Sequence, residues 1–378
     1  MRKISISFAK EALYNAFRFI INVGFIFLFQ MIFHAENTLT AVALGVGFTM
    51  LPNSELHIRP GAMCCIVLLL YIGGGIAAQS ALLHPALAFL INFWFLVLLL
   101  VLISEPMEMK ANISFLLCFV FSQSTYVPWT QFPARLACVS FGALLICGCI
   151  VLNWKRKGIG RNGCTLKEQF QRSKVHRSYI LRMSLGISIA MLIASIFQLS
   201  KPLWISIVVM SLTQLEFSET LERIRHRFIG TLAGIVLFFV FFQLLIPQQY
   251  AMLVIMLLGY IGFFLPEYKY KQVINAISAL NASLVILDTK TAIENRLFCL
   301  ILGIVIVIVI YMLAHIARKV HRIQRWSVHT AMADDHPKSK ETAVLFQIST
   351  CTCGERIHQH HPVLFSIKKM ELTRAFSV

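Results

Sequence analysis

Long apolar segments dominate the chain, and their lengths restrict what it can fold into. A helix that crosses a bilayer needs about 20 apolar residues, within a range of roughly 17–25. Each half of the chain holds four long apolar segments and two short ones. The long segments lie near Leu13–Phe33, Ala62–Leu83, Pro85–Ile103, Phe132–Asn153, Tyr179–Leu199, Ile229–Ile246, Gln249–Leu265 and Glu294–Ala317, and the short ones near Thr38–Leu51, Ile113–Val127, Leu203–Leu215 and Val273–Leu287. We therefore predict an all-α polytopic membrane protein with about twelve spans. Its short helices either sit in thinned bilayer or are shielded inside the bundle as broken or re-entrant helices.

The composition excludes the other broad classes of protein. Apolar residues make up 58% of the chain and charged residues 13%, whereas a soluble domain is about 25% charged. The metal-protease, serine-hydrolase and P-loop motifs do not occur, so we predict neither an enzyme nor a cofactor. A G-x-G-x-x-G pattern at Gly158, Gly160 and Gly163 follows an apolar span instead of a strand, and we interpret it as coincidental.

The second half of the chain repeats the first in residue positions as well as in segment lengths. The coinciding pairs include Arg18/Arg182, Glu55/Glu219, Arg59/Arg223 and Gln79/Gln243 at a shift of 164 positions, and Arg135/Arg296 and Gly142/Gly303 at a shift of 161. We therefore predict that residues 1–153 and 179–317 form two six-span repeats. An even number of spans brings both repeats in from the same side, so the repeats should be parallel, related by an axis along the membrane normal.

The basic residues are distributed unequally between the two predicted sides of the membrane. Of the 34 Lys and Arg residues, only Arg135, Lys201, Lys290 and Arg296 fall on one side, and the net charges are +16 and +1. Basic loops face the cytoplasm, so both termini are predicted to be cytoplasmic, in the inner membrane of a bacterium. The basic linker, residues 154–178, is expected to face anionic lipids, and the excess charge then requires no nucleic acid.

The last part of the chain, residues 318–378, is predicted to be a flexible basic tail in the cytoplasm. It contains Cys351-x-Cys353, followed by His358, His360 and His361. The one-residue spacing of the cysteines is shorter than that of structural zinc sites, so we predict no metal site.

Residues 202–234 carry the most information about function. Leu203–Leu215 is a short apolar segment, and Glu216–Phe228 after it is amphipathic. We expect the amphipathic part to lie along the cytoplasmic interface. The G-x-x-x-G that begins at Gly230 then opens the next span with a smooth surface for the close approach of another helix.

This segment resembles the fusaric acid resistance (FUSC) family of aromatic acid exporters. The family pattern combines a short helix containing Trp with a Gln, a Thr and an R-x-x-G-T-x-x-G block. The matching positions are Trp204, Gln214, Thr220, Arg227, Gly230, Thr231 and Gly234. The first half has Thr40 where the Trp would stand, and the short linker makes this a compact form without the large cytoplasmic domain of bigger exporters. The resemblance implies secondary efflux of amphipathic aromatic carboxylates.

Six residues are candidates for binding such a substrate. They are Arg182, Trp204, Gln214, Arg227, Asn275 and Arg296. A guanidinium can hold both oxygens of a carboxylate, and the Trp ring could contact the aromatic ring. All of them except Arg227 also have a simpler interpretation. Arg182 could snorkel to the surface, Arg296 could anchor a helix end, Trp204 could belong to the interfacial belt, and the two amides could cap helices.

We predict an inner-membrane transporter that exports aromatic or other organic carboxylates. Acidic residues are almost absent from the spans, which gives little support to proton coupling through a buried carboxylate and leaves an organic-anion channel as an alternative. A non-transporting envelope protein or a membrane-embedded enzyme is a third alternative. The expected partners are a small organic anion and anionic lipids, and the sequence leaves homo-oligomerisation open.

Overall fold

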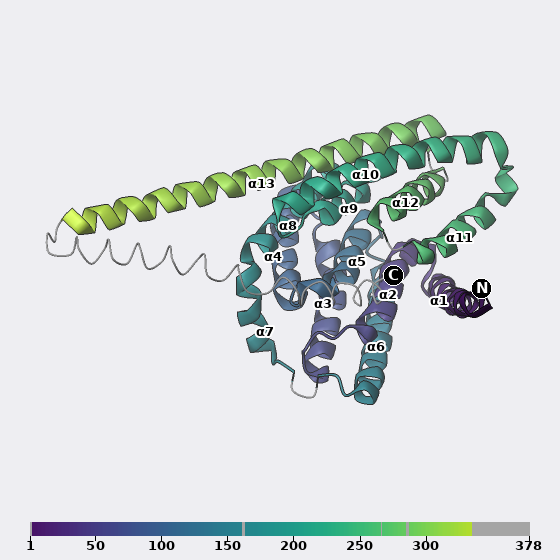
Figure 1. The fold of residues 1–378 in the computed structure, drawn as a ribbon, viewed down its shortest axis with the longest axis horizontal. Coiled ribbons are helices and arrows are strands. Elements are labelled where there is room, and N and C mark those ends of the chain that lie inside the picture. The colour runs from purple at the N-terminus through teal and green to yellow at the C-terminus, as the bar shows by residue number, and fades with distance from the viewer. Residues whose placement is uncertain (1, 161–162, 266, 285–286, 335–378) are drawn as a thin grey trace.

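The computed structural model describes residues 2–160, 163–265, 267–284 and 287–334, and these residues are almost entirely helical (Figure 1). The first half contains α1 (Arg2–Phe33), α2 (Thr38–Met50), α3 (Pro60–Ser80), α4 (Pro85–Ile103), α5 (Asn112–Ser124) and α6 (Phe132–Lys157). A linker helix, α7 (Leu166–Ser173), follows. The second half contains α8 (Arg177–Ile196), α9 (Leu203–Leu212), α10 (Phe217–Phe238), α11 (Ala251–Ile261), α12 (Tyr268–Ser283) and α13 (Thr289–Asp334).

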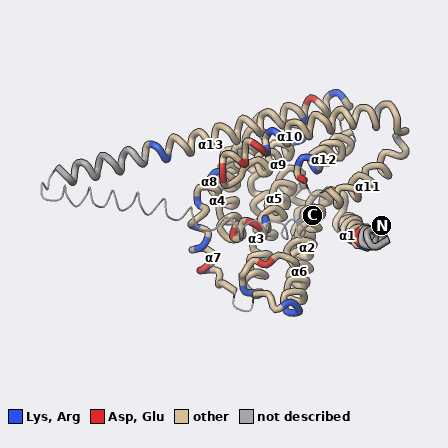
Figure 2. Tube along the Cα trace, in the orientation of Figure 1, with Lys and Arg blue, Asp and Glu red and all other residues tan. Residues whose placement is uncertain are grey.

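In the described part of the chain, seven helices are long and apolar enough to cross a membrane. These candidate spans are Lys10–Phe33, Pro60–Ser80, Pro85–Ile103, Phe132–Lys157, Leu166–Ile196, Phe217–Phe242 and Thr289–Val320. Figure 2 shows Lys, Arg, Asp and Glu gathered largely at helix ends and around α7, with long stretches of α4 and α11 free of them. The prediction of an all-α, multi-pass membrane protein is thus confirmed.

Local sequence signals set several helix ends. A proline occupies the first turn of α3, α4 and α6, where its missing N–H is not needed. Gly158 ends α6 in the left-handed conformation with a φ of 68°. Thr165 and Glu168 form a capping box at the start of α7, in which each side chain binds the backbone N–H of the other residue.

Two boundaries in the second half differ from those expected. The amphipathic residues Glu216–Phe228 do not form a separate interfacial helix, because α10 runs unbroken from Phe217 to Phe238 and continues as a π-helix to Leu245. No proline interrupts it, and Gly230 is used for packing instead of a break. The expected long span Gln249–Leu265 contains only the short helix α11, extended by one 3₁₀ turn.

The two halves share one main hydrophobic core, in which α4 packs against α8 and α5 against α9. A second, smaller core lies between α10, α12 and α13, around Phe238, Ile277, Leu280 and Ala292. The residues of the predicted tail from 335 to 378, including its Cys and His residues, lie outside the described part of the chain.

The close helix approach predicted from the G-x-x-x-G is confirmed, and α12 is the partner of α10. A Cβ atom on Gly234 would lie 2.6 Å from the Cβ of Ala276 and 2.9 Å from the carbonyl oxygen of Val273. A Cβ atom on Gly230 would lie 2.8 Å from the Cβ of Gln272. Neither glycine has room for a side chain, so the two backbones pack directly on each other.

We expect Gly234→Ala to destabilise the protein by roughly 1–3 kcal/mol, because the added methyl group overpacks the contact with α12. Thermal unfolding of the purified protein in detergent measures the effect. Gly148→Ala is the matched control, since a Cβ atom there meets nothing within 4 Å and alanine favours a helix over glycine. Equal changes in Tm for the two variants would contradict the packing argument.

Candidate functional site

The short helix α9 organises the candidate site. It has only 10 residues, which span about 15 Å, and it packs against α8 and α13 with smaller contacts to α5 and α10. The neighbouring α13 runs parallel to it: Arg296 lies at Trp204 and Gly303 at Val208. Five of the six candidate residues lie at two levels, one at each end of α9.

At the start of α9, Arg296 lies over Trp204. The guanidinium carbon is 4.9 Å from the centroid of the indole ring, which is cation–π geometry. Arg296 is 6% exposed and Trp204 is 4% exposed, so Trp204 does not belong to an exposed interfacial belt. Within the described chain no hydrogen bond or ion pair engages Arg296.

At the end of α9, Arg182 lies against Tyr311. The guanidinium carbon is 4.2 Å from the centroid of the phenol ring, and Nη2 donates to the carbonyl oxygens of Gln214 (3.4 Å) and Leu215 (2.9 Å). The hydroxyl of Tyr311 in turn accepts from the backbone N–H of Gln214 and from Thr220, and donates to the carbonyl of Gln214. Arg182 is 7% exposed, so it does not snorkel to the surface.

Two further arginines, Arg223 and Arg227, reach the same end of α9 from α10. Nη1 of Arg227 donates to the hydroxyl of Ser211 at 2.5 Å and to that of Tyr268 at 3.4 Å. Arg223 donates to the carbonyl of Ser211 at 3.3 Å and lies 5.0 Å from the ring of Tyr268. Arg227 is 3% exposed.

The first half contributes a positive charge to this end of α9 through Lys110. Desolvation lowers the pKa of Lys110, and the positive charges of Arg223 and Lys271 lower it further, whereas the carboxylate of Glu219 opposes the shift. Lys110 precedes α5 in the first half, whereas Arg223, Glu219 and Lys271 belong to α10 and α12 in the second. This mainly basic group of residues therefore lies where the two halves meet.

Arg182, Arg227 and Arg296 have no carboxylate partner among the residues that the structure describes. The ion pairs among the described residues involve other groups, and the oxygens that accept from these arginines belong to hydroxyls and carbonyls. Several buried donors nearby also have no hydrogen-bond partner in the described chain: Nε of Arg182, Nε of Arg227, and the hydroxyls of Ser184, Ser188 and Ser206. Buried charges are costly unless paired, so the arrangement is suited to a mobile anion.

The structure places the two candidate amide residues, Gln214 and Asn275, differently. Gln214 caps the end of α9, since its Nε2 donates to the carbonyls of Thr213 (2.8 Å) and Ser211 (3.4 Å). Asn275 does not open its helix as expected. It lies about two turns inside α12, which begins at Tyr268, and it is exposed. The structure therefore brings five of the six candidates to the two ends of α9 and leaves Asn275 apart.

Sequence reasoning missed Tyr311, Tyr268 and Ser211, which hold the arginines in place. Tyr311 could have been noticed, because it interrupts an aliphatic run in α13. Tyr268 and Ser211 carry no such signal, since their partners are distant in the chain.

Residues 189–310 match the family described as fusaric acid resistance protein-like. The match covers less than half of the chain. It contains Trp204, Gln214, Arg227, Asn275 and Arg296, while Arg182 lies just before it. Comparisons with the curated proteins and with the solved structures gave no match.

Proposed function

Since residues 189–310 form a fusaric acid resistance protein-like domain in a multi-pass membrane protein, we propose that the protein transports aromatic and other organic carboxylates out of a bacterial cell. The family implies transport only in general terms. The class of substrate is proposed from the family resemblance together with the chemistry at the two ends of α9.

The observation that carries the proposal is the set of three buried arginines, Arg182, Arg227 and Arg296, that have no carboxylate partner within the described ranges. Arg296 offers an unengaged guanidinium, which can bind both oxygens of a carboxylate. The indole of Trp204 beside it supplies an aromatic face. An amphipathic anion with one charged end and one ring fits this pair better than a fully hydrated inorganic ion does.

We propose further that the halves are parallel six-span repeats with both termini in the cytoplasm. The packing of the second helix against the sixth, which is alike in the two halves, supports the parallel repeats. In each half the second helix runs parallel to the sixth, and the contacts agree with the sequence shifts: Leu44 meets Gly142 in the first half, and Val208 meets Gly303 in the second. The unequal charge of the two sides supports the orientation.

The orientation has a direct test in cysteine labelling. A cysteine introduced at Lys167 should react with a membrane-impermeant maleimide only in inside-out vesicles. One introduced at His84 should react only in right-side-out vesicles. Both positions are exposed, so the opposite pattern would overturn the proposed orientation.

No carboxylate pairs with Arg182, Arg227 or Arg296 among the described residues, which also favours a second mode of transport, an organic-anion channel. A proton-coupled exporter usually holds an acidic or His group that titrates within its path. A channel needs only the electrochemical gradient of the anion.

Flux into and out of liposomes tests the function and separates the two modes. The panel contains benzoate, hydroxybenzoates and, as an uncharged control of similar size, benzyl alcohol measured against protein-free liposomes. Saturable carboxylate flux that needs a pH gradient supports an exporter, and flux that follows the anion gradient alone supports a channel. No carboxylate flux above that of protein-free liposomes would overturn the proposed function.

A further inference from the structure

Helix α12 carries a mainly polar stripe on the face turned away from α10. Lys271, Asn275, Ser278 and Ala282 are spaced by four, three and four positions, so they line one face of the helix. Asn275 and Ala282 are exposed, and Lys271 and Ser278 are half-buried. We call these four residues the α12 stripe. The residues that α12 buries lie on its other side: Gln272, Ala276, Ile277, Leu280 and Ser283.

The α12 stripe lies at the depth of a membrane span. The two glycine contacts between α10 and α12 described above pair residues that are 42 positions apart in both cases, so the two helices run parallel. The same offset sets Ser278 level with Val236. Val236 lies in the candidate span Phe217–Phe242 and is 61% exposed. At one depth, α10 therefore exposes an apolar side chain and α12 a polar one.

A polar face at this depth needs water or protein beside it. Lipid tails offer no hydrogen bonds, so polar groups on membrane helices face the interior of the bundle or a water-filled cavity. Asn275 is exposed, and among the described residues no hydrogen bond engages its side chain. The α12 stripe is therefore suited to contact with water and not with lipid.

The contacts on either side of the α12 stripe show what it faces. On the helix surface the stripe lies between Ala279, which packs against the main core shared by the two halves, and Ile274, which lies next to Gly262 at the end of α11. The helix α11 in turn contacts α1 of the first half, where the hydroxyl of Tyr260 donates to the carbonyl of Ala12 at 3.0 Å. The α12 stripe thus faces the side bounded by α11, α1 and the main core, where the two halves meet.

The α12 stripe extends from one level of arginines toward the other. Its first residue, Lys271, belongs to the mainly basic group at the end of α9. Near its other end, Leu280 lies in the same small core as Ala292, which is one turn before Arg296 in α13. From its first to its last residue the stripe rises about 16 Å, close to the about 15 Å length of α9.

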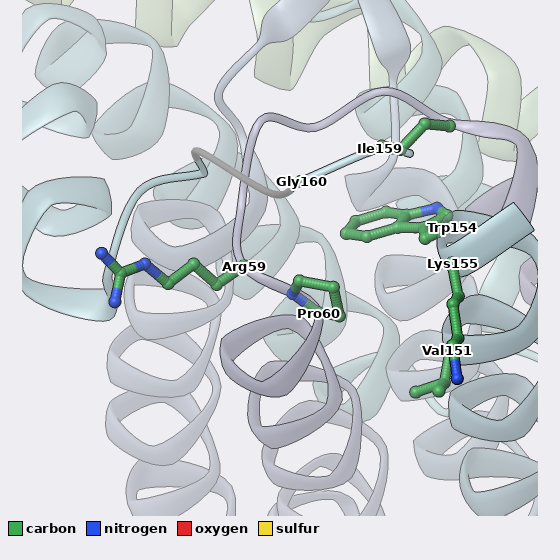
Figure 3. A pocket seen from close by; sticks show the side chains of 7 residues that line it. All are labelled: Arg59, Pro60, Val151, Trp154, Lys155, Ile159 and Gly160. Carbon is green, nitrogen blue, oxygen red and sulfur yellow. The ribbon is translucent and has the colours of Figure 1, made fainter. Parts of the chain in front are cut away.

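The crevice at the ends of α3 and α6 is a different kind of feature (Figure 3). Arg59, Trp154 and Lys155 are among its lining residues, and the guanidinium of Arg59 points away from the other two. Nε of Arg59 donates to the carbonyl of Gly163 in the linker at 3.1 Å. Trp154 is fully buried, and its Nε1 donates to the carbonyl of Pro52 at 3.1 Å. This crevice therefore joins the linker to the first half, and we place no route for a solute there.

We propose that the α12 stripe lines a water-filled route by which the anion passes between the two levels of arginines. Asn275 and Ser278 supply hydrogen-bond donors along the route, and Lys271 supplies positive charge at its entrance. The inference rests on the proposed function for the identity of the anion, and it adds the wall that the anion follows.

Cysteine labelling of the full-length protein in liposomes tests whether the α12 stripe lies in water. Ser278→Cys is compared with Val236→Cys, the matched control at the same level of the neighbouring helix. An anionic methanethiosulfonate reacts with the thiolate, which forms in water and not in apolar surroundings, so Ser278→Cys should be labelled at least about tenfold faster. The mass of the peptide that carries each residue distinguishes its thiol from the native cysteines. Saturating 4-hydroxybenzoate should slow this labelling, and the labelled protein should lose most of its flux.

Three outcomes would overturn the inference. They are equal labelling rates for Ser278→Cys and Val236→Cys, labelling of Asn275→Cys no faster than that of Val236→Cys, and unchanged flux after complete labelling of Ser278→Cys. Each variant must elute as a monodisperse protein with an unchanged Tm, so a folding defect is measured separately. Absence of flux in the parent protein would overturn the proposed function, whereas slow labelling of a protein that does carry flux would overturn only the role of the α12 stripe.

Discussion

Arg296→Gln is expected to reduce the flux of aromatic carboxylates by about tenfold to a hundredfold, the range that a lost hydrogen bond to a charged group gives. The reason is that Arg296 is buried over Trp204 and engages no other group in the described chain. Its charge is thus available to a substrate. Flux of 4-hydroxybenzoate into liposomes, normalised to the amount of inserted protein, measures the effect.

Arg296→Lys is the informative companion variant. Lysine keeps the charge but loses the planar pair of donors, so we expect intermediate flux with a raised KM for carboxylates. The stability of both variants should stay near that of the parent protein, because no hydrogen bond to the described chain is lost. Unchanged flux in Arg296→Gln would exclude this residue from the substrate path.

Arg135→Gln is expected to have the opposite effect, a large loss of stability. Arg135 is almost completely buried and donates to the side-chain oxygen of Asn37 (3.0 Å), and to the carbonyls of Ser122 (2.7 Å), Thr125 (2.7 Å) and Glu36 (3.2 Å). Its guanidinium therefore ties together the ends of α2, α5 and α6. Breaking such a buried charged network costs roughly 3–5 kcal/mol.

Thermal unfolding in detergent and the yield of monodisperse protein measure the stability of this variant. The comparison with Arg296→Gln is matched, since the same substitution is made at positions that coincide at a shift of 161. An equal loss of stability in the two variants would contradict a structural role for Arg135 and a substrate-binding role for Arg296.

The different roles of Arg135 and Arg296 could not be predicted from the sequence. Arg135 and Arg296 coincide when the sequence is shifted by 161 positions, and the spacing to Gly142 and Gly303 is the same. What separates them is the packing around each guanidinium. Asn37 provides a side-chain acceptor for Arg135 from almost a hundred residues away, whereas the position of Thr40 in the first half is taken by Trp204 in the second, which presents a ring to Arg296.

Apolar length predicted the helices, because helix formation depends on local sequence. Glycine spacing predicted the close packing of α10, and the structure adds that α12 is its partner. The predictions for Glu216–Phe228 and Gln249–Leu265 were wrong for related reasons. Amphipathicity does not by itself end a helix, and α10 runs through it. An apolar run does not by itself make one long helix, and α11 stays short. Tertiary contacts and turns determine where α10 and α11 begin and end, and hydropathy alone does not predict these contacts.

The shortness of α9 has a consequence for the energetics of transport. The hydrocarbon core of a bilayer is about 30 Å thick, but the two arginine levels are separated by only the about 15 Å of this helix. With water-filled approaches to both levels, most of the membrane voltage would fall across this short helix. A negative cell interior drives a monovalent anion outward with about 2.3 kcal/mol per 100 mV, which sustains a concentration ratio of roughly 50-fold. Efflux on this path requires no proton-binding group.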